Sequence, residues 1–549
     1  MFAQEMTGSE ALAYGAMESG VQFVTGYPGS PATGVVEALL RLNDGSVRIE
    51  WGVNEKAAFE AAFGASLAGV RSLLCIKSVG LNIALDALMV GNLAGGEGGF
   101  VIVVGDDPGG WGSQNEEDSR PLVAAAEVPL LEPIHAGQAR PVMHRAFDIS
   151  EKFRVPVVVR LTRALAENRT ARPEAPPTIP PRPQADFQPQ PERYNVLPVR
   201  VVELHRQLQT NMSRVRTIFE HSKLNVEEGT APRGVLVAGQ VADKLYQVLG
   251  GSRADALRIL QLSTLNPLPT SRIAVFLRQV DSVLVLEEVQ PYVETQVLAI
   301  AQRAGLTLPI YGRFTGHVPG AGELFAPHVA LALTALLPDW TLPPFQRTHR
   351  AMPSREPLCE GCPYIPTLEA LQALMQDHGG RKSFVVTGEA GCMVRAQLPP
   401  WEILDVKYGL GASIGLAAGL ARTGIPQHIV ALAGDSALLH SGLGGLIDAV
   451  QAGVRLLVIV LDNGTTALSG KQPHPASGYD VQGHPRPAVD LAALVRAAGV
   501  DTVRVVDAFD AGAVRSALEE GLAAEDVAVV IAKGDCPYAP GMNEDVARG

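Results

Sequence analysis

The feature that most restricts the fold is a pair of apolar runs, residues 430–433 and 456–461, joined by one helix-like segment. Neither run contains a polar residue, which is typical of parallel strands covered on both faces. The residues between the runs show helical spacing at Leu443, Leu446, Ile447 and Val450. A strand, a helix and a second strand in this order predict a parallel sheet, and therefore an α/β fold.

Polar residues follow both predicted strands. Gly434-Asp435-Ser436 ends the first run, and Asp462-Asn463-Gly464-Thr465 ends the second. Open parallel sheets bind ligands at the carboxyl ends of their strands, so we expect Asp435 and Asn463 to lie close together. One carboxylate, one amide oxygen and the backbone carbonyl of Thr465 would form a site of hard oxygen ligands. Such a site suits Mg²⁺ shared with a diphosphate, because Mg²⁺ takes its remaining ligands from phosphate and water.

The composition agrees with packed α/β layers. The chain has 549 residues, enough for three or four domains. Hydrophobic residues make up 47% and aromatic residues only 5%, with 56 glycines, which favours α/β layers over a β-sandwich or a disordered chain. The net charge of −12 disfavours an extended phosphate-backbone partner, so we expect no nucleic acid.

The sequence also indicates the cellular compartment of the chain. Residues 1–10 lack a basic stretch followed by an apolar run, so we expect no signal peptide. No apolar run approaches the ~20 residues that span a bilayer, so we expect no membrane partner. Five cysteines in so long a chain do not form a disulfide framework. A reducing, cytoplasmic setting is the simplest interpretation.

Residues 1–167 alternate strand and helix signals and are predicted to form one α/β domain. Strands are expected at 21–25, 48–51, 73–76 and 100–104, and helices at 10–19, 32–40, 57–67 and 81–89. Glu55 opens the third of these helices. An acid in the first turn is usually there for the helix dipole. The polar loop 113–120, taken alone, is expected to be a solvated surface segment.

Four further segments complete the predicted organisation. Residues 168–230 contain a proline-rich linker and a helical arm over 199–221. Residues 231–337 form a smaller α/β domain with strands at 235–238, 258–262 and 282–286, and Glu287-Glu288 after the last strand is interpreted as an acidic surface turn. A second linker spans 338–357. The last α/β domain spans 358–549.

The cysteines and histidines alone give weak signals. Cys359 and Cys362 are spaced like half of a metal site or a redox pair, but no second pair follows, Cys392 stands alone and Cys536 is distant in the sequence. The pattern therefore disfavours a metal site. His440 and His474 occur in polar loops, where a structural and a catalytic role are equally compatible with the sequence.

Several motifs together resemble a known family. Gly-Asp-Ser at 434–436, 25 further residues and then Asp-Asn resemble the thiamine diphosphate-binding motif. Four blocks in the first domain resemble the α subunit of indolepyruvate:ferredoxin oxidoreductase: GYPGSP, EWGVNEK, IKSVGLN and GDDPGGWGSQNEEDSR. The resemblance covers about residues 5–537, and its blocks occur in the same order. That family decarboxylates aryl pyruvates, forms an acyl-CoA and passes electrons to ferredoxin.

The resemblance implies a thiamine diphosphate-binding fold. It has two doubly wound parallel-sheet domains, one of the pyrimidine-binding type (1–167) and one of the diphosphate-binding type (358–549), and a smaller transketolase C-terminal-like domain (231–337). It implies a homodimer, with the cofactor between the two types of domain. Beside a thiamine motif, Glu55 becomes the catalytic acid, because its carboxyl would hydrogen-bond the aminopyrimidine ring and favour the imino tautomer that deprotonates the thiazolium carbon.

The resemblance also assigns site residues. Cofactor contacts are expected at Gly29, Glu55, Cys362, Gly411, Ser413, Gly434, Asp435, Ser436, Asn463 and Thr465. The Mg²⁺ ligands are expected to be Asp435, Asn463 and Thr465. Residues at the substrate end are expected to be Ser30, Lys77, Ser78, Gln114, Asn115, Tyr364 and His440.

The chain departs from the family at three places. No run of cysteines with ferredoxin spacing is present, so we expect no iron–sulfur cluster in this chain and a separate β subunit and electron carrier as partners. Ser78 stands where the family has a histidine, and Tyr364-Ile365 replaces its His-Arg. Those groups are the ones best able to move protons or pair with a carboxylate.

Three hypotheses follow for the function. The first is a thiamine diphosphate- and Mg²⁺-dependent oxidoreductase that decarboxylates a 2-oxo acid of the aryl pyruvate type and passes electrons to a separate partner. The second is a non-oxidative 2-oxo acid decarboxylase or carboligase that works without iron–sulfur clusters. The third is a cofactor-binding subunit that has lost catalysis and serves as a scaffold or sensor.

Overall fold

The computed structural model describes residues 5–180, 184–250, 256–339 and 357–539, which fold into two compact units. Unit 1 comprises Met1–Glu50 and Glu55–Met352, and unit 2 comprises Trp51–Asn54 and Pro353–Gly549. The linker predicted over 338–357 falls almost entirely on 340–356, outside the described residues. Each unit is described by itself.

The larger sheet of unit 1 has seven strands in the order β12-β6-β7-β5-β4-β2-β3. The strands from β6 to β2 pair in parallel, and β12 joins the edge antiparallel to β6. The strands are β2 (Phe23–Gly26), β3 (Arg48–Trp51), β4 (Ser72–Lys77), β5 (Phe100–Asp106), β6 (Leu130–Leu131), β7 (Val157–Thr162) and β12 (Thr264–Asn266). The four strands predicted for this domain are therefore confirmed.

Two groups of helices pack on this sheet. α1 (Gly8–Glu18) contacts α2 (Thr33–Leu42) and α6 (Ala136–Phe153), and α3 (Glu55–Leu67) contacts α4 (Ser78–Ala94). A capping box fixes the start of α1, with the Thr7 side chain accepting from Glu10 N and the Glu10 side chain accepting from Thr7 N. Gly15 lets α1 and α6 approach closely, because a Cβ at this position would lie 3.0 Å from the Arg140 Cα. The short helices α5 (Arg120–Ala125) and α7 (Arg163–Glu167) follow strand ends.

The linker and the arm run along the first domain. β8 (Arg169–Ala171) pairs antiparallel with β1 (Glu5–Thr7), and α8 (Pro191–Tyr194) is held where Arg193 Nη1 lies 2.7 Å from Glu97 Oε1. The predicted arm is confirmed as α9 (Pro198–Glu220). One face of α9 is buried at the helical spacing expected of an amphipathic helix, through Leu204, Leu208, Met212, Val215 and Phe219.

The smaller sheet of unit 1 has the strand order β14-β13-β10-β11-β9, and only β9 is antiparallel. Its strands are β9 (Val226–Glu228), β10 (Arg233–Ala238), β11 (Arg258–Leu262), β13 (Ser282–Leu286) and β14 (Ile310–Tyr311). Its helices are α10 (Val241–Leu249), α11 (Thr270–Leu277), α12 (Tyr292–Arg303) and α13 (Ala326–Leu333). The three predicted strands are confirmed, but β12 from this same segment pairs with the larger sheet.

A buried charge network joins the two sheets of unit 1. Arg160 on β7 contacts Asp106 (Nε to Oδ2, 2.6 Å) and Glu132 (Nη1 to Oε2, 2.8 Å). Arg120 contacts Asp118 (Nη2 to Oδ2, 2.7 Å) and reaches across to Glu287 (Nη1 to Oε2, 2.7 Å). These charges lie in the interface between the two sheets of unit 1, where each acid has a cationic partner.

The network overturns two predictions. Glu287 and Glu288 are not an acidic surface turn: they are 1% and 2% exposed, and Glu288 Oε1 lies 2.7 Å from Lys244 Nζ. The loop 113–120 is not solvated throughout, because it becomes buried from Asp118 onward. Sequence patterns treat charged residues as surface residues. These patterns do not show that an acidic segment of one domain will pair with a basic segment of another.

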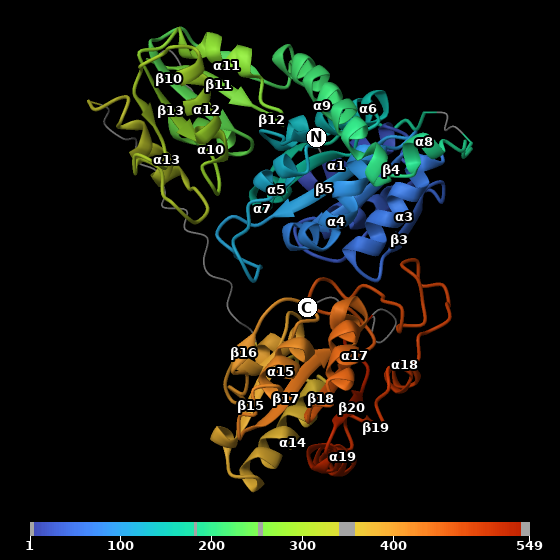
Figure 1. The fold of residues 1–549 in the computed structure, drawn as a ribbon. Helices are drawn as coiled ribbons and strands as arrows, with labels where there is room; N and C mark the ends of the chain where they lie inside the picture. The colour runs from blue at the N-terminus through green and yellow to red at the C-terminus, as the bar shows by residue number, and fades with distance from the viewer. Residues whose placement is uncertain (1–4, 181–183, 251–255, 340–356, 540–549) are drawn as a thin grey trace. The chain divides into compact units, whose positions relative to one another are not determined.

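Unit 2 is built on a six-stranded, wholly parallel sheet in the order β16-β15-β17-β18-β20-β19 (Figure 1, orange to red). Its strands are β15 (Phe384–Gly388), β16 (Val406–Lys407), β17 (His428–Gly434), β18 (Leu456–Asp462), β19 (Thr502–Asp507) and β20 (Val527–Lys533). Its helices are α14 (Tyr364–Asp377), α15 (Ser413–Ala421), α16 (Asp435–Ala437), α17 (Leu443–Gln451), α18 (Leu491–Ala497) and α19 (Ala511–Ala523).

The strand–helix–strand unit predicted between 430 and 461 is confirmed as β17, α17 and β18 in parallel register. Separate apolar clusters contain alternate residues of its strands. Val430 and Leu432 belong to one cluster, whereas Ala431 and Ala433 belong to the other. Both strands are thus buried on both faces, as their unbroken apolar sequences predicted. Among the described residues of both units, no helix has the length and apolarity needed to cross a bilayer.

Candidate active site

In unit 1, the Glu55 carboxyl is buried at the start of α3. The loop after β3 leads directly into this helix, and Glu55 is 5% exposed. Gly80 on α4 makes room for it, because a Cβ at Gly80 would lie 2.6 Å from Glu55 Oε1. A carboxyl held inside the protein against a glycine is not explained by the helix dipole alone. The role of Glu55 toward a cofactor stays a prediction.

Two of the predicted substrate loops meet beside this domain's strand ends. Gly29 follows β2 and packs on Lys77 at the end of β4, where a Cβ at Gly29 would lie 2.9 Å from the Lys77 Cβ. Lys77 Nζ donates to the Gly112 carbonyl at 2.9 Å, so the loop after β5 joins the same edge. Ser30 is exposed there, while Ser78 is buried in the first turn of α4.

Asp107 shapes the loop that carries Gln114 and Asn115. Its Oδ2 accepts from Gly112 N at 2.7 Å and from Ser113 Oγ at 2.6 Å. Gln114 and Asn115 are both exposed, and Asn115 Nδ2 donates to Glu117 Oε2 at 3.0 Å. These side chains are therefore available to a ligand at the edge formed by the neighbouring loops.

In unit 2, Asp435 lies at the centre of the polar turns after β17 and β18. It is 2% exposed, and its Oδ2 accepts from Asn463 N at 3.1 Å and Gly464 N at 2.8 Å. His474 Nε2 lies 3.1 Å from the same oxygen. The predicted approach of Asp435 and Asn463 is confirmed. The involvement of His474 was left open by the sequence, because its loop is far from Asp435 in the chain.

A second carboxylate, Asp462, lies beside Asp435. Burial and the Asp435 charge raise the pKa of Asp462 to about 6, and the opposing effect of Lys533 is smaller. The Asn463 Oδ1 accepts from Thr465 N at 3.1 Å, so amide and carboxylate oxygens gather at one strand edge. Two neighbouring buried carboxylates are a chemically suitable place for a divalent cation. The donor set therefore fits Mg²⁺, with the carbonyl of Thr465 adjacent in the chain.

Glu389 connects three of the predicted cofactor turns. It is fully buried after β15, accepts from Gly434 N at 2.9 Å and accepts from Ser413 Oγ at 3.1 Å. Burial raises the pKa of Glu389 to about 7. The sequence analysis did not select this residue. Its signal was present, since an acid follows a buried strand there as Asp435 does.

Gly411, one of the predicted cofactor contacts, lies in a tight turn. Gly411 has φ +75°, and a Cβ at this position would lie 2.0 Å from Ser441 Oγ and 2.9 Å from Gly442 N. Only glycine fits this backbone and this spacing. His440 is buried next to it, with Nδ1 3.0 Å from Ser441 Oγ, in a π-helical turn over Leu438–Gly442.

Tyr364 is buried more deeply than a residue facing a substrate would be. It starts α14 and is 4% exposed, and its hydroxyl donates to the Leu461 carbonyl at 3.2 Å. Burial raises the pKa of Tyr364 well above its ordinary value, and the Asp435 charge adds to the increase. The Tyr364 ring thus lies near Asp435, while its hydroxyl proton is donated to the Leu461 carbonyl.

Four cysteines of unit 2 that are separated in the sequence approach one another. Burial raises the pKa of Cys392 to about 12, and the nearby thiols of Cys362, Cys536 and Cys359 add to the increase. Burial also raises the pKa of Cys362 to about 11. Cys536 N donates to the Asn463 carbonyl at 3.1 Å, so the chain after β20 returns to the acidic edge.

In the described part of the chain, no group of three or more His, Cys, Asp or Glu side chains is arranged to hold a metal ion.

Comparison with known proteins identifies the family. Residues 389–532 match the thiamine pyrophosphate enzyme C-terminal TPP-binding domain, and residues 14–222 match the pyruvate flavodoxin/ferredoxin oxidoreductase thiamine diphosphate-binding family. The indolepyruvate oxidoreductase subunit IorA of Archaeoglobus fulgidus is 32% identical over 97% of this chain and 86% of the relative. The chain belongs to the family of indolepyruvate oxidoreductase subunit IorA. The subunit of the same name from Methanothermobacter marburgensis is 31% identical over 98% of this chain and 87% of the relative.

Membership fixes the class of chemistry. The chain is a thiamine diphosphate-dependent 2-oxoacid oxidoreductase, and its α/β fold is that of thiamine diphosphate-binding proteins. Among solved structures, a 2-oxoglutarate:ferredoxin oxidoreductase from Magnetococcus marinus has a TM-score of 0.48 and 17% identity, covering 61% of this chain and 65% of that chain. At this level the similarity carries no argument about the present site. The two matched regions do contain Glu55 and Asp435, one in each unit.

Proposed function

We propose that this member of the indolepyruvate oxidoreductase family uses Mg²⁺ with thiamine diphosphate to decarboxylate a 2-oxo acid with an aryl side chain, and that it passes the electrons to a separate partner. The observation that carries the proposal is the pair of buried carboxylates, Asp435 and Asp462, at the carboxyl edge of the unit 2 sheet. The names of the relatives support the aryl substrate.

The metal part of the proposal assigns the ligands Asp435, Asn463 and Thr465. The Asp435 carboxylate and the Asn463 Oδ1 would bind Mg²⁺ together with the Thr465 carbonyl. A cation there would oppose the repulsion that raises the pKa of Asp462. The diphosphate would complete the coordination, because Mg²⁺ is commonly bound by few protein ligands and by phosphate oxygens.

The remaining cofactor contacts are proposed by residue, each within its own unit. When bound, thiamine diphosphate supplies the ring that accepts the electron pair left when CO₂ departs from the substrate. Glu55 would hold a proton at the aminopyrimidine ring from its buried position beside Gly80. The other expected contacts are Gly29, Cys362, Gly411, Ser413, Gly434 and Ser436.

The substrate would meet the exposed polar loops. Lys77 is a suitable partner for the substrate carboxylate, because its ammonium lies at the edge where the loops after β2, β4 and β5 meet. Ser30, Ser78, Gln114, Asn115 and His440 complete the proposed set. Tyr364 would contribute as a wall of the site, since its hydroxyl already donates to Leu461.

The partners are also part of the proposal. The relatives are named as subunits, which supports a separate β subunit and an electron carrier. We also propose a homodimer in the cytoplasm, where the five free cysteines would remain reduced. A monomeric mass in solution for the protein with its cofactor bound would contradict the dimer.

The direct test compares Glu55→Gln with wild type. The assay supplies thiamine diphosphate, Mg²⁺, indolepyruvate, coenzyme A as acyl acceptor and a viologen dye as electron acceptor, with and without the partner subunit. We expect Glu55→Gln to lower turnover by about 10²- to 10⁴-fold, the range of general acid–base catalysis, while cofactor binding measured by calorimetry is retained.

A matched control lies one turn further along the same helix. Glu60 is exposed and pairs with Lys56 at 2.6 Å, so Glu60→Gln should leave turnover unchanged. Equal turnover of Glu55→Gln and wild type would overturn the role of Glu55. Release of CO₂ at the full rate without an acceptor would overturn the oxidative reaction and favour the decarboxylase.

A further inference from the structure

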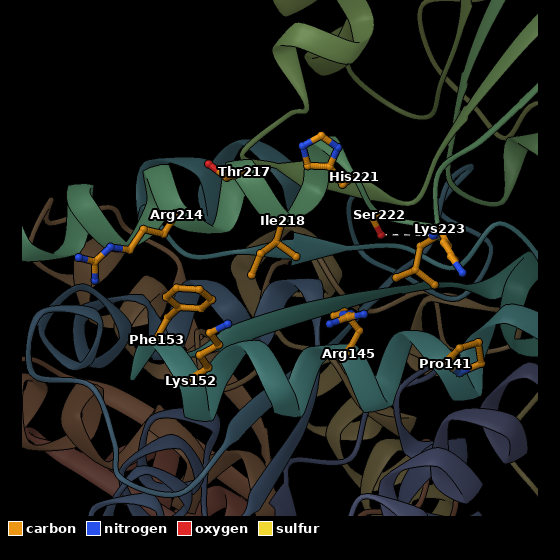
Figure 2. A pocket seen from close by; sticks show the side chains of 11 residues that line it. Pro141, Arg145, Lys152, Phe153, Arg214, Thr217, Ile218, His221, Ser222 and Lys223 are labelled. Carbon is orange, nitrogen blue, oxygen red and sulfur yellow. Dashed lines mark hydrogen bonds between the residues drawn. The ribbon is translucent and has the colours of Figure 1, made fainter.

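A basic groove lies between two helices on the outside of unit 1. It is formed by α6 and α9 with the residues that follow α9, and its volume is about 940 Å³. Figure 2 shows Arg145 and Lys152 on α6, Arg214 on α9 and His221 directly after α9. The groove has the size of a small-molecule site.

The charges in the groove are of one sign. Its basic residues are Arg145, Lys152, Arg214, His221 and Lys223, and none of the described residues that line it is acidic. The side chains of Arg145, Arg214 and Lys223 have no ion pair or hydrogen bond within the described structure.

The groove is separate from the strand ends that carry the catalytic residues. It is lined by residues of α6, of α9 and of the segment after α9, whereas Glu55 begins α3 and Lys77 ends β4. Phe153 and Ile218 lie between the two helices and provide apolar surface, while Thr217 and Ser222 provide hydroxyl groups (Figure 2). Cations, hydroxyls and a small apolar surface are the groups that bind phosphates joined to a ring.

We propose that this groove binds a polyphosphorylated nucleotide as a site distinct from the catalytic one. Arg145 and Lys223 would contact the linked phosphates from the two sides of the groove. The base would lie against Ile218 and Phe153. An acidic protein partner is the other class that the charge could attract, but such a partner needs an extended surface, and these cations line the walls of a hollow.

The test uses the full-length protein saturated with thiamine diphosphate and Mg²⁺, so that the diphosphate site is already occupied. Calorimetry then measures the binding of ATP, tripolyphosphate and adenosine. We expect one ATP per chain, weaker binding of tripolyphosphate, no binding of adenosine, and a loss of affinity as the salt concentration rises. Tripolyphosphate binding as tight as ATP would overturn the assignment to a nucleotide in favour of free polyphosphate.

Charge-reversal variants locate the site. Arg145→Glu and Lys223→Glu should each weaken ATP binding by about tenfold or more, because each removes a charge-assisted contact and adds repulsion. Arg216→Glu is the matched control: it is exposed on α9 but does not line the groove, so ATP affinity should be unchanged. Thermal melting checks that all three variants fold.

Two outcomes would overturn the proposal. One is ATP affinity that is the same in Arg145→Glu, Lys223→Glu and wild type. The other is binding of poly-glutamate, lost in Arg145→Glu, without any binding of ATP, which would assign the groove to an acidic protein.

Discussion

Two strand edges of this molecule bury several acids, and they neutralise them differently. At the interface in unit 1, Asp106 and Glu132 share the guanidinium of Arg160, which lies 2.6 and 2.8 Å away. At the edge in unit 2, Asp435 and Glu389 accept mainly from backbone N–H groups, a serine hydroxyl and a histidine. The unit 1 edge contains arginines that pair with its acids. The unit 2 edge has fewer cationic side chains than buried acids.

The difference separates structure from function. Buried acids with a built-in arginine hold two parts of the chain together. In unit 2, burial and the Asp435 charge raise the pKa of Asp462 to about 6, and burial raises the pKa of Glu389 to about 7. Among the described residues neither acid forms an ion pair with an arginine or lysine, so this edge is suited to a ligand that brings positive charge. Burial of an acid therefore does not by itself mark an active site, whereas a missing cation does.

The largest expected effect comes from removing the built-in cation. Arg160→Met leaves Asp106 and Glu132 buried without their shared cation, and we expect a loss of about 3–5 kcal/mol in the free energy of unfolding. Urea unfolding measures it. The control is Arg172→Met, which removes only an exposed ion pair with Glu10 and should cost less than about 1 kcal/mol. Similar small losses for both variants would remove the distinction between the two edges.

The second effect is a pH dependence at the other edge. The folded-state pKa of Glu389, about 7, lies above its ordinary value of 4.5, so the folded state binds the proton more tightly than the unfolded state. Stability should be complete below about pH 4.5 and fall as the pH rises towards 7, by about 3 kcal/mol in total.

Melting temperatures across this pH range test the Glu389 prediction. Glu389→Gln should flatten the slope between pH 4.5 and 7, because it cannot lose a proton. Glu369→Gln, an exposed position on α14, is the control and should keep the wild-type slope. An unchanged slope in Glu389→Gln would show that this carboxyl is compensated as fully as the acids of unit 1.

The smallest effect concerns thiol reactivity beside the acidic edge. With pKa values of about 11 for Cys362 and about 12 for Cys392, their thiolate fractions at pH 8 should be at least about hundredfold below that of an ordinary cysteine. Iodoacetamide should therefore label the exposed Cys359 first. Mass spectrometry of the labelled peptides measures the order. Faster labelling of Cys392 than of Cys359 would mean that a positive charge already lies at this edge.

The sequence predicted what depends on local pattern. The parallel pair β17 and β18, the turn residues Asp435 and Asn463 and the arm α9 follow from apolar spacing and strand-end rules, and the structure confirms them. Local signals suffice because each of these features is formed by residues that are close in the chain or by adjacent parallel strands.

What the sequence missed depends on contacts between distant segments. Glu287 becomes buried because Arg120 from another domain reaches it, and the four cysteines gather because the chain after β20 returns to the start of unit 2. His474 reaches Asp435 from a long loop. No periodicity or spacing in one sequence encodes these distances. The domain boundaries and the roles of the individual site residues stay predictions.

The most direct test of the account is calorimetric titration of thiamine diphosphate into the protein with Mg²⁺ and again with a chelator. The acid-rich edge of unit 2 predicts binding that requires Mg²⁺ and that is lost in Asp435→Asn, while the variant keeps the wild-type fold in the absence of cofactor. Equal binding with and without Mg²⁺, or full affinity in Asp435→Asn, would contradict the claim that this edge awaits a cation and a diphosphate.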